Sequence, residues 1–306
     1  MRDAFSSALV RLASADRKVL LLTGDHGYAL FDDFRRECPK QYINAGIAEQ
    51  NMVGMAAGLA RVGFRPFVYG LAAFVPIRTI EQIKLDIAHD DLPVVLLGDG
   101  AGFVYSHLGT SHQSTEDIAC TRSIPNMTVL SPADRFEMES CMNYAYSAKQ
   151  PVYLRMGKSD RGDVHTGPID ALKSGQLIKL RDGRTDRPGL IATGAMAVTA
   201  LRVAEELNLM AWSAPMLKPL DSKDVCSAAS ITKGLVTLEE HSILGGLGGA
   251  VAEIISQDHP TRLLRLGVED RFSSHCGSHA YLLHEHGLDD NSVLRRVSEF
   301  CGLSLP

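Results

Sequence analysis

One carboxylate in an otherwise small and apolar helix is the first feature of this sequence that indicates chemistry. Glu49 stands in the stretch INAGIAEQNMVGMAAGLARVG, residues 43–63, among Gly, Ala, Met and Val. A carboxylate in a first helical turn is stabilised by the unpaired backbone N–H groups there. A carboxyl in an apolar environment instead favours its protonated form and can share a proton near neutral pH. From the pattern alone, Glu49 is either a capping charge or a buried catalytic acid.

Other residues with chemical potential have plain structural explanations when each is considered by itself. Phe74 in AAFVPIR follows an expected strand, where a Phe is usually part of the core. His112 in GTSHQST is a loop histidine, and such side chains are usually solvent-exposed. Asp25 in LLTGDHG is suited to a helix N-cap. Arg2 suits a solvated terminal charge, so none of these residues indicates a site without its context.

The elements that must position these residues follow an alternating α/β pattern. Short apolar runs rich in β-branched residues predict strands, and segments of helical period lie between them, which is typical of parallel sheets covered by helices. The predicted strands cover residues 19–24, 65–70, 92–100, 127–132, 151–157, 188–194, 234–241 and 261–268. The main predicted helices cover residues 6–15, 49–63, 77–90, 132–148, 195–208, 245–259 and 289–302.

A polar, glycine-containing passage divides this pattern into two α/β units, each a mostly parallel sheet flanked by helices. The predicted first domain spans residues 1–162, a linker with a small hairpin or turn spans 163–176, and a smaller second domain spans 177–306. With 306 residues, the chain is long enough for each domain to bury a substantial core.

Composition excludes several classes of function. A net charge of −5 without a block of one sign speaks against nucleic acid or an anionic membrane as the main partner. The sequence has no run of about 18 apolar residues that would span a bilayer, and no signal-peptide pattern. Six dispersed cysteines predict buried thiols in a reducing compartment. We therefore expect a cytoplasmic protein that acts on small molecules.

Several motifs, in order along the chain, carry a family resemblance. GIAEQNMVGMAAGLA, AAFVPIRTIEQIKLDIAHDDLPVVLLGDGAGF, GTSHQSTEDIACTRSIPNMTVLSPAD and PVYLRMGK resemble the pyrimidine-binding domain of the transketolase family of thiamine diphosphate enzymes. LKPLD and EEHSILGGLGGAVAE resemble the C-terminal domain of the same family. The resemblance extends over nearly the whole chain, and the collinear order is more specific than any single motif.

The resemblance implies a role for the Glu49 carboxyl. In this family a glutamate in this segment forms a hydrogen bond to N1′ of the aminopyrimidine and so helps the cofactor to lose a proton from C2. The resemblance also implies that the Phe74 ring stacks on the aminopyrimidine. Asp25 and Arg78 would be further cofactor contacts. These expectations favour the catalytic interpretation of Glu49.

Roles toward substrate follow from the same resemblance. His112 would face the substrate, donating to a developing oxyanion or moving protons. Arg155 and Arg2 would grip a sugar phosphate through paired hydrogen bonds. Relatives that handle phosphorylated sugars usually have an Asp at the position of Leu108, so the usual acceptor is in doubt. His107 would take over a polar contact, or the site would favour a deoxygenated or otherwise unusual sugar.

The string GDG at 98–100 looks like part of a metal-binding motif but does not indicate a metal site in this chain. Asp99 and Asn126 have the spacing of the family's diphosphate and magnesium motif, but Asn126 precedes its predicted strand instead of following it. We therefore expect no metal ligand in this chain. The resemblance then implies a partner subunit that carries the diphosphate-binding domain and ligates Mg²⁺, with two copies of each chain in an α2β2 assembly.

Three functions remain open from the sequence. The leading one is the C-terminal subunit of a split, thiamine diphosphate-dependent transketolase that transfers a two-carbon ketol unit from a ketose or ketose phosphate to an aldose. The second is the β subunit of a 2-oxo acid dehydrogenase or decarboxylase, which has the same architecture and activating glutamate. The third is a catalytically silent scaffold, against which the joint presence of Glu49, Phe74 and His112 argues.

Overall fold

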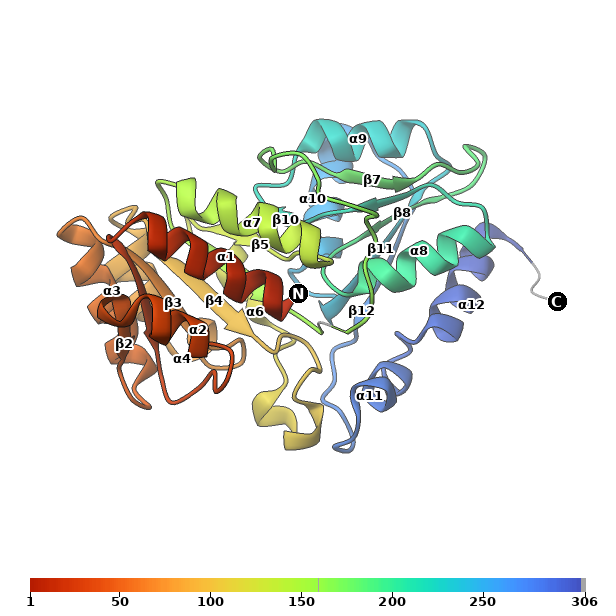
Figure 1. Ribbon diagram of the computed structural model, residues 1–306. Coiled ribbons are helices and arrows are strands. Elements are labelled where there is room, and N and C mark those ends of the chain that lie inside the picture. The colour runs from red at the N-terminus through yellow and green to blue at the C-terminus, as the bar shows by residue number, and fades with distance from the viewer. Residues whose placement is uncertain (159, 304–306) are drawn as a thin grey trace.

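The chain folds around two separate β-sheets, one from each half (Figure 1). The structure is a computed structural model, and it describes residues 1–158 and 160–303. The first sheet has the strand order β10-β5-β6-β4-β3-β1-β2, and its strands are parallel except for β10. Its strands are β1 (Val19–Thr23), β2 (Tyr42–Asn44), β3 (Arg65–Leu71), β4 (Val95–Asp99), β5 (Thr128–Leu130), β6 (Val152–Met156) and β10 (Met216–Lys218).

Helices cover both faces of the first sheet, as the continuous apolar strands require. On β1, Leu20 and Leu22 belong to one buried cluster, whereas Val19 and Leu21 belong to another on the opposite face. The first cluster contains side chains of α3 (Glu49–Arg61), α4 (Val75–Arg78) and the π-helical turn η2 (Ile83–Ala88). The second contains side chains of α1 (Arg2–Ala15), α2 (Asp32–Glu37) and α7 (Arg135–Ser147).

The helix predicted over residues 77–90 is broken into three pieces. α4 ends at Arg78, α5 (Ile80–Gln82) follows, and the chain then continues through η2. The Thr79 hydroxyl donates a hydrogen bond to the Val75 carbonyl one turn back, a contact that bends helices. Short π-helical turns inside helices often lie near functional sites, and this segment follows Phe74 directly.

The second sheet has the order β12-β11-β8-β9-β7, with only β7 antiparallel. Its strands are β7 (Ile178–Arg181), β8 (Gly189–Ala192), β9 (Ala211–Ser213), β11 (Leu235–Ser242) and β12 (Leu263–Val268). The helices of this half are α8 (Met196–Glu206), α9 (Ser222–Ser230), α10 (Leu247–Asp258), α11 (His279–Glu285) and α12 (Asp290–Cys301). The predicted fold class, two mostly parallel sheets flanked by helices, is confirmed.

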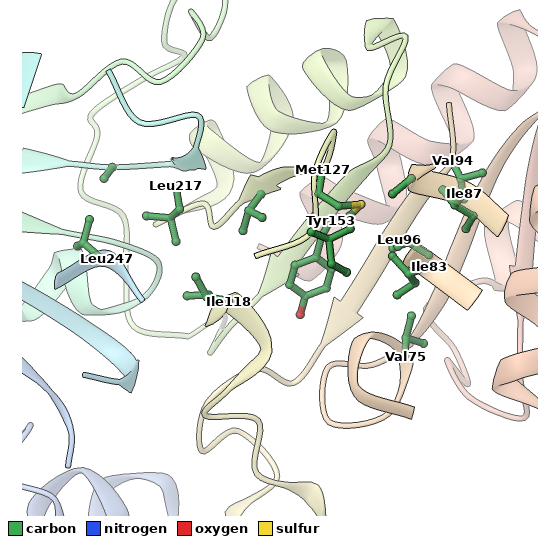
Figure 2. Close-up of a cluster of buried hydrophobic side chains, with 14 of the residues drawn as sticks. Val75, Ile83, Ile87, Val94, Leu96, Ile118, Met127, Tyr153, Leu217 and Leu247 are labelled. Carbon is green, nitrogen blue, oxygen red and sulfur yellow. The ribbon is translucent and has the colours of Figure 1, made fainter. Parts of the chain in front are cut away.

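The two halves share strands and core. β10 comes from the second half of the chain yet pairs antiparallel with β5 at the edge of the first sheet. One buried cluster runs from Val75 and Ile83 beside the first sheet to Leu217 and Leu247 (Figure 2). The predicted domain boundaries therefore stay a prediction, since a strand and a core cross between the halves.

The predicted linker is attached to the first half. Residues 163–176 contain turns and extended chain but neither a helix nor a strand. The Val164 and His165 backbone N–H groups donate to Oδ2 of Asp134 at 3.0 and 2.9 Å. Among the described residues, no helix has the length and apolar character needed to cross a membrane.

Candidate active site

Glu49 is the first residue of α3 and is largely buried. The whole residue is 8% exposed, and its Oε1 lies 3.4 Å from Nη1 of Arg78. The N-cap residue is Ala48, and no side-chain capping bond forms at this helix start. The carboxylate therefore lies in the first turn, as both sequence interpretations require, but its recorded partner is a side chain and not the helix backbone.

The Phe74 ring contacts both Arg78, the partner of Glu49, and His112. The Arg78 guanidinium carbon stands 3.8 Å from the centre of the Phe74 ring. The His112 ring meets Phe74 edge-on, with 5.1 Å between ring centres. His26 approaches the same ring, with centres 6.5 Å apart. Four residues predicted from the sequence therefore lie together, and the structure adds His26 to them.

These side chains come from the carboxyl ends of neighbouring parallel strands. His26 follows β1, Phe74 follows β3, and His112 lies on the long loop after β4, in the short 3₁₀ turn η4 (Thr110–His112). In open parallel sheets, ligands bind in the crevice outside these strand ends. The available signal for His26 was its place in a glycine-flanked loop directly after a buried strand. The sheet topology therefore brings these side chains together at one edge of the sheet, from segments far apart in sequence. We refer to the group formed by the side chains of His26, Glu49, Phe74, Arg78 and His112 as the crevice.

Asp25 lies at the exposed edge of this region. The Tyr28 hydroxyl donates to its Oδ1 at 3.4 Å. The suggested helix N-cap role is wrong, because the next helix begins at Asp32 and is preceded by Phe31 as its N-cap. His26, its neighbour, is the residue of this loop whose ring approaches Phe74. A cofactor contact from Asp25 stays a prediction.

Arg2 is bound to a buried acid and is not a free terminal charge. Its Nη2 lies 3.8 Å from Oδ2 of Asp99. The same oxygen accepts hydrogen bonds from the hydroxyls of Tyr69 at 2.7 Å and Tyr105 at 2.8 Å. Burial is the largest single influence and opposes the charge on Arg2, but Asp99, Tyr69 and Tyr105 together outweigh it and raise the Arg2 pKa. Asp99 thus serves two tyrosines and an arginine. The described residues hold no group of three or more side chains suited to a metal ion.

The structure places Arg155 in the interior of the protein, which differs from the substrate-binding position predicted from the sequence. Its side chain is 3% exposed, and its Nε donates to Oδ2 of the buried Asp117 at 2.8 Å. Its Nη2 donates to the Glu240 carbonyl at 2.7 Å and, at 3.4 Å, to that of Ser114. Burial is the largest single influence and opposes its charge, but Asp117, Tyr153 and Glu240 together outweigh it and raise the Arg155 pKa. The Arg155 guanidinium connects α6 (Asp117–Arg122) to β11. Because its Nε and Nη2 donors are used in these buried contacts, the geometry does not fit the predicted binding of a sugar phosphate.

The residues of the loop after β4 that were linked to acceptor choice lie at the surface. Leu108 is 50% exposed, at the end of the 3₁₀ turn η3 (Ser106–Leu108). His107 beside it is also exposed. His112 is half-buried, and its Nδ1 lies 3.0 Å from the Ser111 hydroxyl, which orients the imidazole. Leu108 is therefore placed on the same loop as His112, at an open position.

Comparison with known proteins agrees with this geometry. The profile described as "Transketolase, pyrimidine binding domain" matches residues 1–162, and that described as "Transketolase, C-terminal domain" matches residues 181–293. The chain belongs to the transketolase family. The members of this family are transferases, and the family as a whole implies dependence on thiamine diphosphate.

Relatives of similar length resemble the chain from end to end. It is 34% identical to one subunit of the apulose-4-phosphate transketolase of Phocaeicola vulgatus, over 98% of this chain and 96% of that protein. It is 36% identical to "Putative transketolase C-terminal section" of Methanocaldococcus jannaschii, over 98% of this chain and 95% of that protein. A solved structure, "Split gene transketolase, inactive beta4 tetramer", superposes with a TM-score of 0.88 at 34% identity, over 99% and 98%. The chain thus resembles split transketolase subunits.

The crevice fits the pyrimidine half of thiamine diphosphate. The Arg78 guanidinium is planar, lies over the face of Phe74 and points a donor at Glu49. A planar aminopyrimidine needs the same two contacts, an aromatic face and a carboxyl partner. Arg78 is half-exposed, at 51% of its side chain, whereas the Glu49 side chain that it contacts is only 10% exposed. A cofactor contact from Arg78, as the sequence resemblance implies, stays a prediction.

Proposed function

We propose that this chain is the C-terminal subunit of a two-chain transketolase. The enzyme would transfer a two-carbon ketol unit from a ketose or ketose phosphate donor to an aldose acceptor. The observation that carries the proposal is the buried Glu49 beside the Phe74 ring at the carboxyl ends of the first sheet. The Phocaeicola relative is named as a subunit of a transketolase, which supports the division into two chains.

Each residue of the crevice has a defined task in this proposal. When bound, thiamine diphosphate supplies the nucleophilic carbon that carries two-carbon units. Glu49 holds a proton at N1′ of the aminopyrimidine, in a place with little water. Phe74 orients the ring by stacking after Arg78 has swung away. His112, held through Nδ1 by Ser111, uses Nε2 to donate to the oxygen of the substrate carbonyl.

A partner subunit completes the site in this proposal. It would bind the diphosphate and ligate Mg²⁺, as the family resemblance implies. Apolar side chains are exposed on and around α3 and the segment packed against it, an arrangement typical of interaction surfaces: Ile47, Met55, Val62, Ile80 and Leu85. The face of α3 that carries Gly54 and Gly58 has no atom within 4 Å of an added Cβ, so another chain could approach it closely.

An α2β2 assembly in the cytoplasm is part of the proposal. The structural relative is described as an inactive tetramer of its β chain, which supports the idea that such a subunit needs its partner for activity. The six cysteines, all in the described part of the chain, are free thiols, but the prediction that they are buried holds only for Cys38 and Cys141, and Cys276 is exposed.

Reconstitution tests the division of labour. The purified chain should neither transfer two-carbon units nor bind thiamine diphosphate tightly, and activity should appear when an N-terminal diphosphate-binding subunit is added. Glu49→Gln should lower kcat of the reconstituted enzyme by about 10²- to 10⁴-fold, the usual contribution of a positioned acid or base. Glu139→Gln, a change of the same type at an exposed carboxylate of α7, is the matched control. Turnover by the chain alone, or by Glu49→Gln at the rate of the control, would falsify the proposal.

Leu108 is proposed as a determinant of acceptor choice. Its exposed apolar side chain stands on the loop of His112, where relatives that use phosphorylated sugars usually offer a carboxylate. We expect Leu108→Asp to shift kcat/KM toward aldoses with an additional hydroxyl at the contacted carbon. His107→Ala tests whether the neighbouring imidazole supplies a compensating contact. Equal preferences in wild type and Leu108→Asp would show that the position does not select the acceptor.

Release of carbon dioxide from pyruvate would instead favour the 2-oxo acid enzyme considered from the sequence. We do not propose that function, because both domain profiles and the relatives named above are transketolases. A scaffold without catalysis would tolerate Glu49→Gln, so the same variant separates it from the enzyme.

A further inference from the structure

A cavity of about 470 Å³ lies between the two halves of the chain, apart from Glu49 and Phe74. The loop after β4 forms one wall, and the loop after β12 together with the end of α11 forms the other; these segments extend side by side at the lower edge of Figure 1. The lining residues that bear on its chemistry are Gln113, Glu116, Asp270, Phe272, Ser273 and His286. Nothing in the proposed transfer reaction uses them.

The walls of this cavity are held together by buried contacts. The Phe103 ring stacks on His286, with centres 4.9 Å apart. The Phe103 backbone N–H donates to Oε1 of Glu240 at 2.6 Å, and His279 Nε2 lies 3.0 Å from the same oxygen. The Ser242 N–H donates to the Thr115 carbonyl at 2.7 Å. The cavity therefore belongs to a packed junction between the halves and is not a gap between loose loops.

A chain of three polar side chains crosses the junction. Ser273 Oγ lies 2.9 Å from Oε1 of Gln113 and 3.0 Å from Nε2 of His286. Gln113 is 7% exposed and His286 is 6% exposed. Within the part of the chain that the structure describes, Gln113 Nε2 and His286 Nδ1 are buried without a hydrogen-bond partner. A buried polar group without a hydrogen-bond partner is unfavourable, so a ligand that pairs with both atoms would be stabilised at this position.

The positions of the protons determine whether Gln113 Nε2 and His286 Nδ1 donate or accept a hydrogen bond. The single Ser273 proton goes to the Gln113 carbonyl oxygen, so the Ser273 oxygen accepts from His286 Nε2–H. Burial and the nearby Arg271 lower the His286 pKa, which keeps the imidazole neutral. Nδ1 is then an acceptor, while the Gln113 amide is a donor. If the amide is turned over, both roles reverse, and the site still presents one donor and one acceptor. A hydroxyl group, which both donates and accepts, satisfies either arrangement.

Charge and shape narrow the ligand class. Three carboxylates line the cavity, Glu116, Glu269 and Asp270, against the single guanidinium of Arg271. That guanidinium is already paired with Glu285 at 3.1 Å. Such a lining repels phosphates and carboxylates. Phe272, which is 81% exposed at the cavity, offers an apolar face to the C–H groups of a ring.

We propose that this cavity binds a neutral polyhydroxylated molecule of the size of a free aldose or polyol, through Gln113 and His286, which Ser273 orients. The cavity volume of about 470 Å³ accommodates one such molecule. Gln113 directly follows His112, so the ligand lies behind the loop that carries the candidate catalytic histidine. The proposal does not depend on the transfer reaction, because binding needs neither thiamine diphosphate nor a second chain.

Calorimetric titration of the full chain with D-ribose tests the site, with D-ribose 5-phosphate as the charged counterpart. We expect D-ribose to bind in the millimolar range without cofactor or partner, and the phosphate ester to bind more weakly. Ser273→Ala should weaken D-ribose binding by about 5- to 20-fold, as expected for the loss of a hydrogen-bonding group. Ser230→Ala, at the exposed end of α9, is the matched control. Glu49→Gln should leave D-ribose binding unchanged, which separates this site from the candidate active site.

Absence of D-ribose binding, tighter binding of the phosphate ester, or equal affinities in Ser273→Ala and Ser230→Ala would each overturn the proposal. Circular dichroism of each variant verifies that the chain is folded. A crystal of the wild-type chain soaked in D-ribose provides a measurement that needs no variant: density between Gln113 and His286 supports the site, and density only at Phe74 or none at all overturns it.

Discussion

Replacing Arg155 is the sharpest test of how the two halves are joined. Arg155→Met keeps most of the side-chain volume but removes the guanidinium that Asp117 faces at 2.8 Å. Asp117 is fully buried, and its Oδ1 already has no hydrogen-bond partner among the described residues. After the change, its Oδ2 keeps only the Tyr153 hydroxyl at 2.7 Å. The Glu240 carbonyl also loses a donor.

The expected loss follows from leaving this carboxylate uncompensated. Removing one partner of a buried ion pair costs about 3–5 kcal/mol of unfolding free energy. Urea denaturation followed by fluorescence and circular dichroism measures the loss. Arg61→Met is the matched control, because Arg61 pairs with Asp90 at the surface with half of its side chain exposed. Exposed pairs contribute about 0–1 kcal/mol, so the control should unfold almost as the wild type does.

Two results would refute the structural role of Arg155. One is an unfolding free energy of Arg155→Met within about 1 kcal/mol of the control. The other is a normally stable Arg155→Lys variant whose KM for a phosphorylated donor rises while KM for an unphosphorylated donor does not. The second pattern is the one expected of an arginine that binds the phosphate, as the sequence resemblance implied.

Two further predictions concern the crevice and the junction. Arg78→Ala should retain thiamine diphosphate affinity in the reconstituted enzyme or tighten it by about 2- to 5-fold, because an exposed cation–π contact worth about 0.5–1 kcal/mol no longer competes for Phe74; weaker binding in fluorescence titration would mean that Arg78 is itself a ligand. Burial raises the Glu239 pKa to about 7 and lowers the His241 pKa to about 4. Between about pH 4.5 and 6.5, the folded state binds more protons at Glu239 than the unfolded state does, so the contribution of Glu239 to the unfolding free energy decreases as the pH rises. At His241 the folded state binds fewer protons than the unfolded state, so the contribution of His241 increases as the pH rises. Glu239→Gln should therefore add about 2 kcal/mol to the rise in unfolding free energy over this range, and equal pH slopes in variant and wild type would contradict it.

The strands that the sequence predicted well are those buried on both faces. β1, β3, β4 and β6 are mostly apolar, with Arg155 the one charged residue inside β6, so local composition is enough to predict them. β9 and β10 are three residues each and are separated by two residues, too short for any period to appear. Their strand character comes from their partners: β10 pairs with β5, more than 80 positions earlier in the chain. Pairing over that distance is a tertiary effect that no local pattern contains.

The residues of the candidate site show the same difference between local and tertiary information. The sequence indicates which residue types could act, but the role of a residue also depends on the neighbours that the fold brings to it. Glu49 and Phe74 were selected through the family resemblance, since residue type alone also fits a helix start and the core; the structure places them close to each other through Arg78, and their roles stay predictions. Arg155 was misplaced because its role depends on Asp117 and Glu240, which reach it from α6 and β11. Once the second half of the chain presses Glu240 against β6, the guanidinium serves the junction between the halves. The same junction holds Gln113 against Ser273, one residue from His112, so the interface that occupied Arg155 is also what places the loop bearing the candidate catalytic histidine.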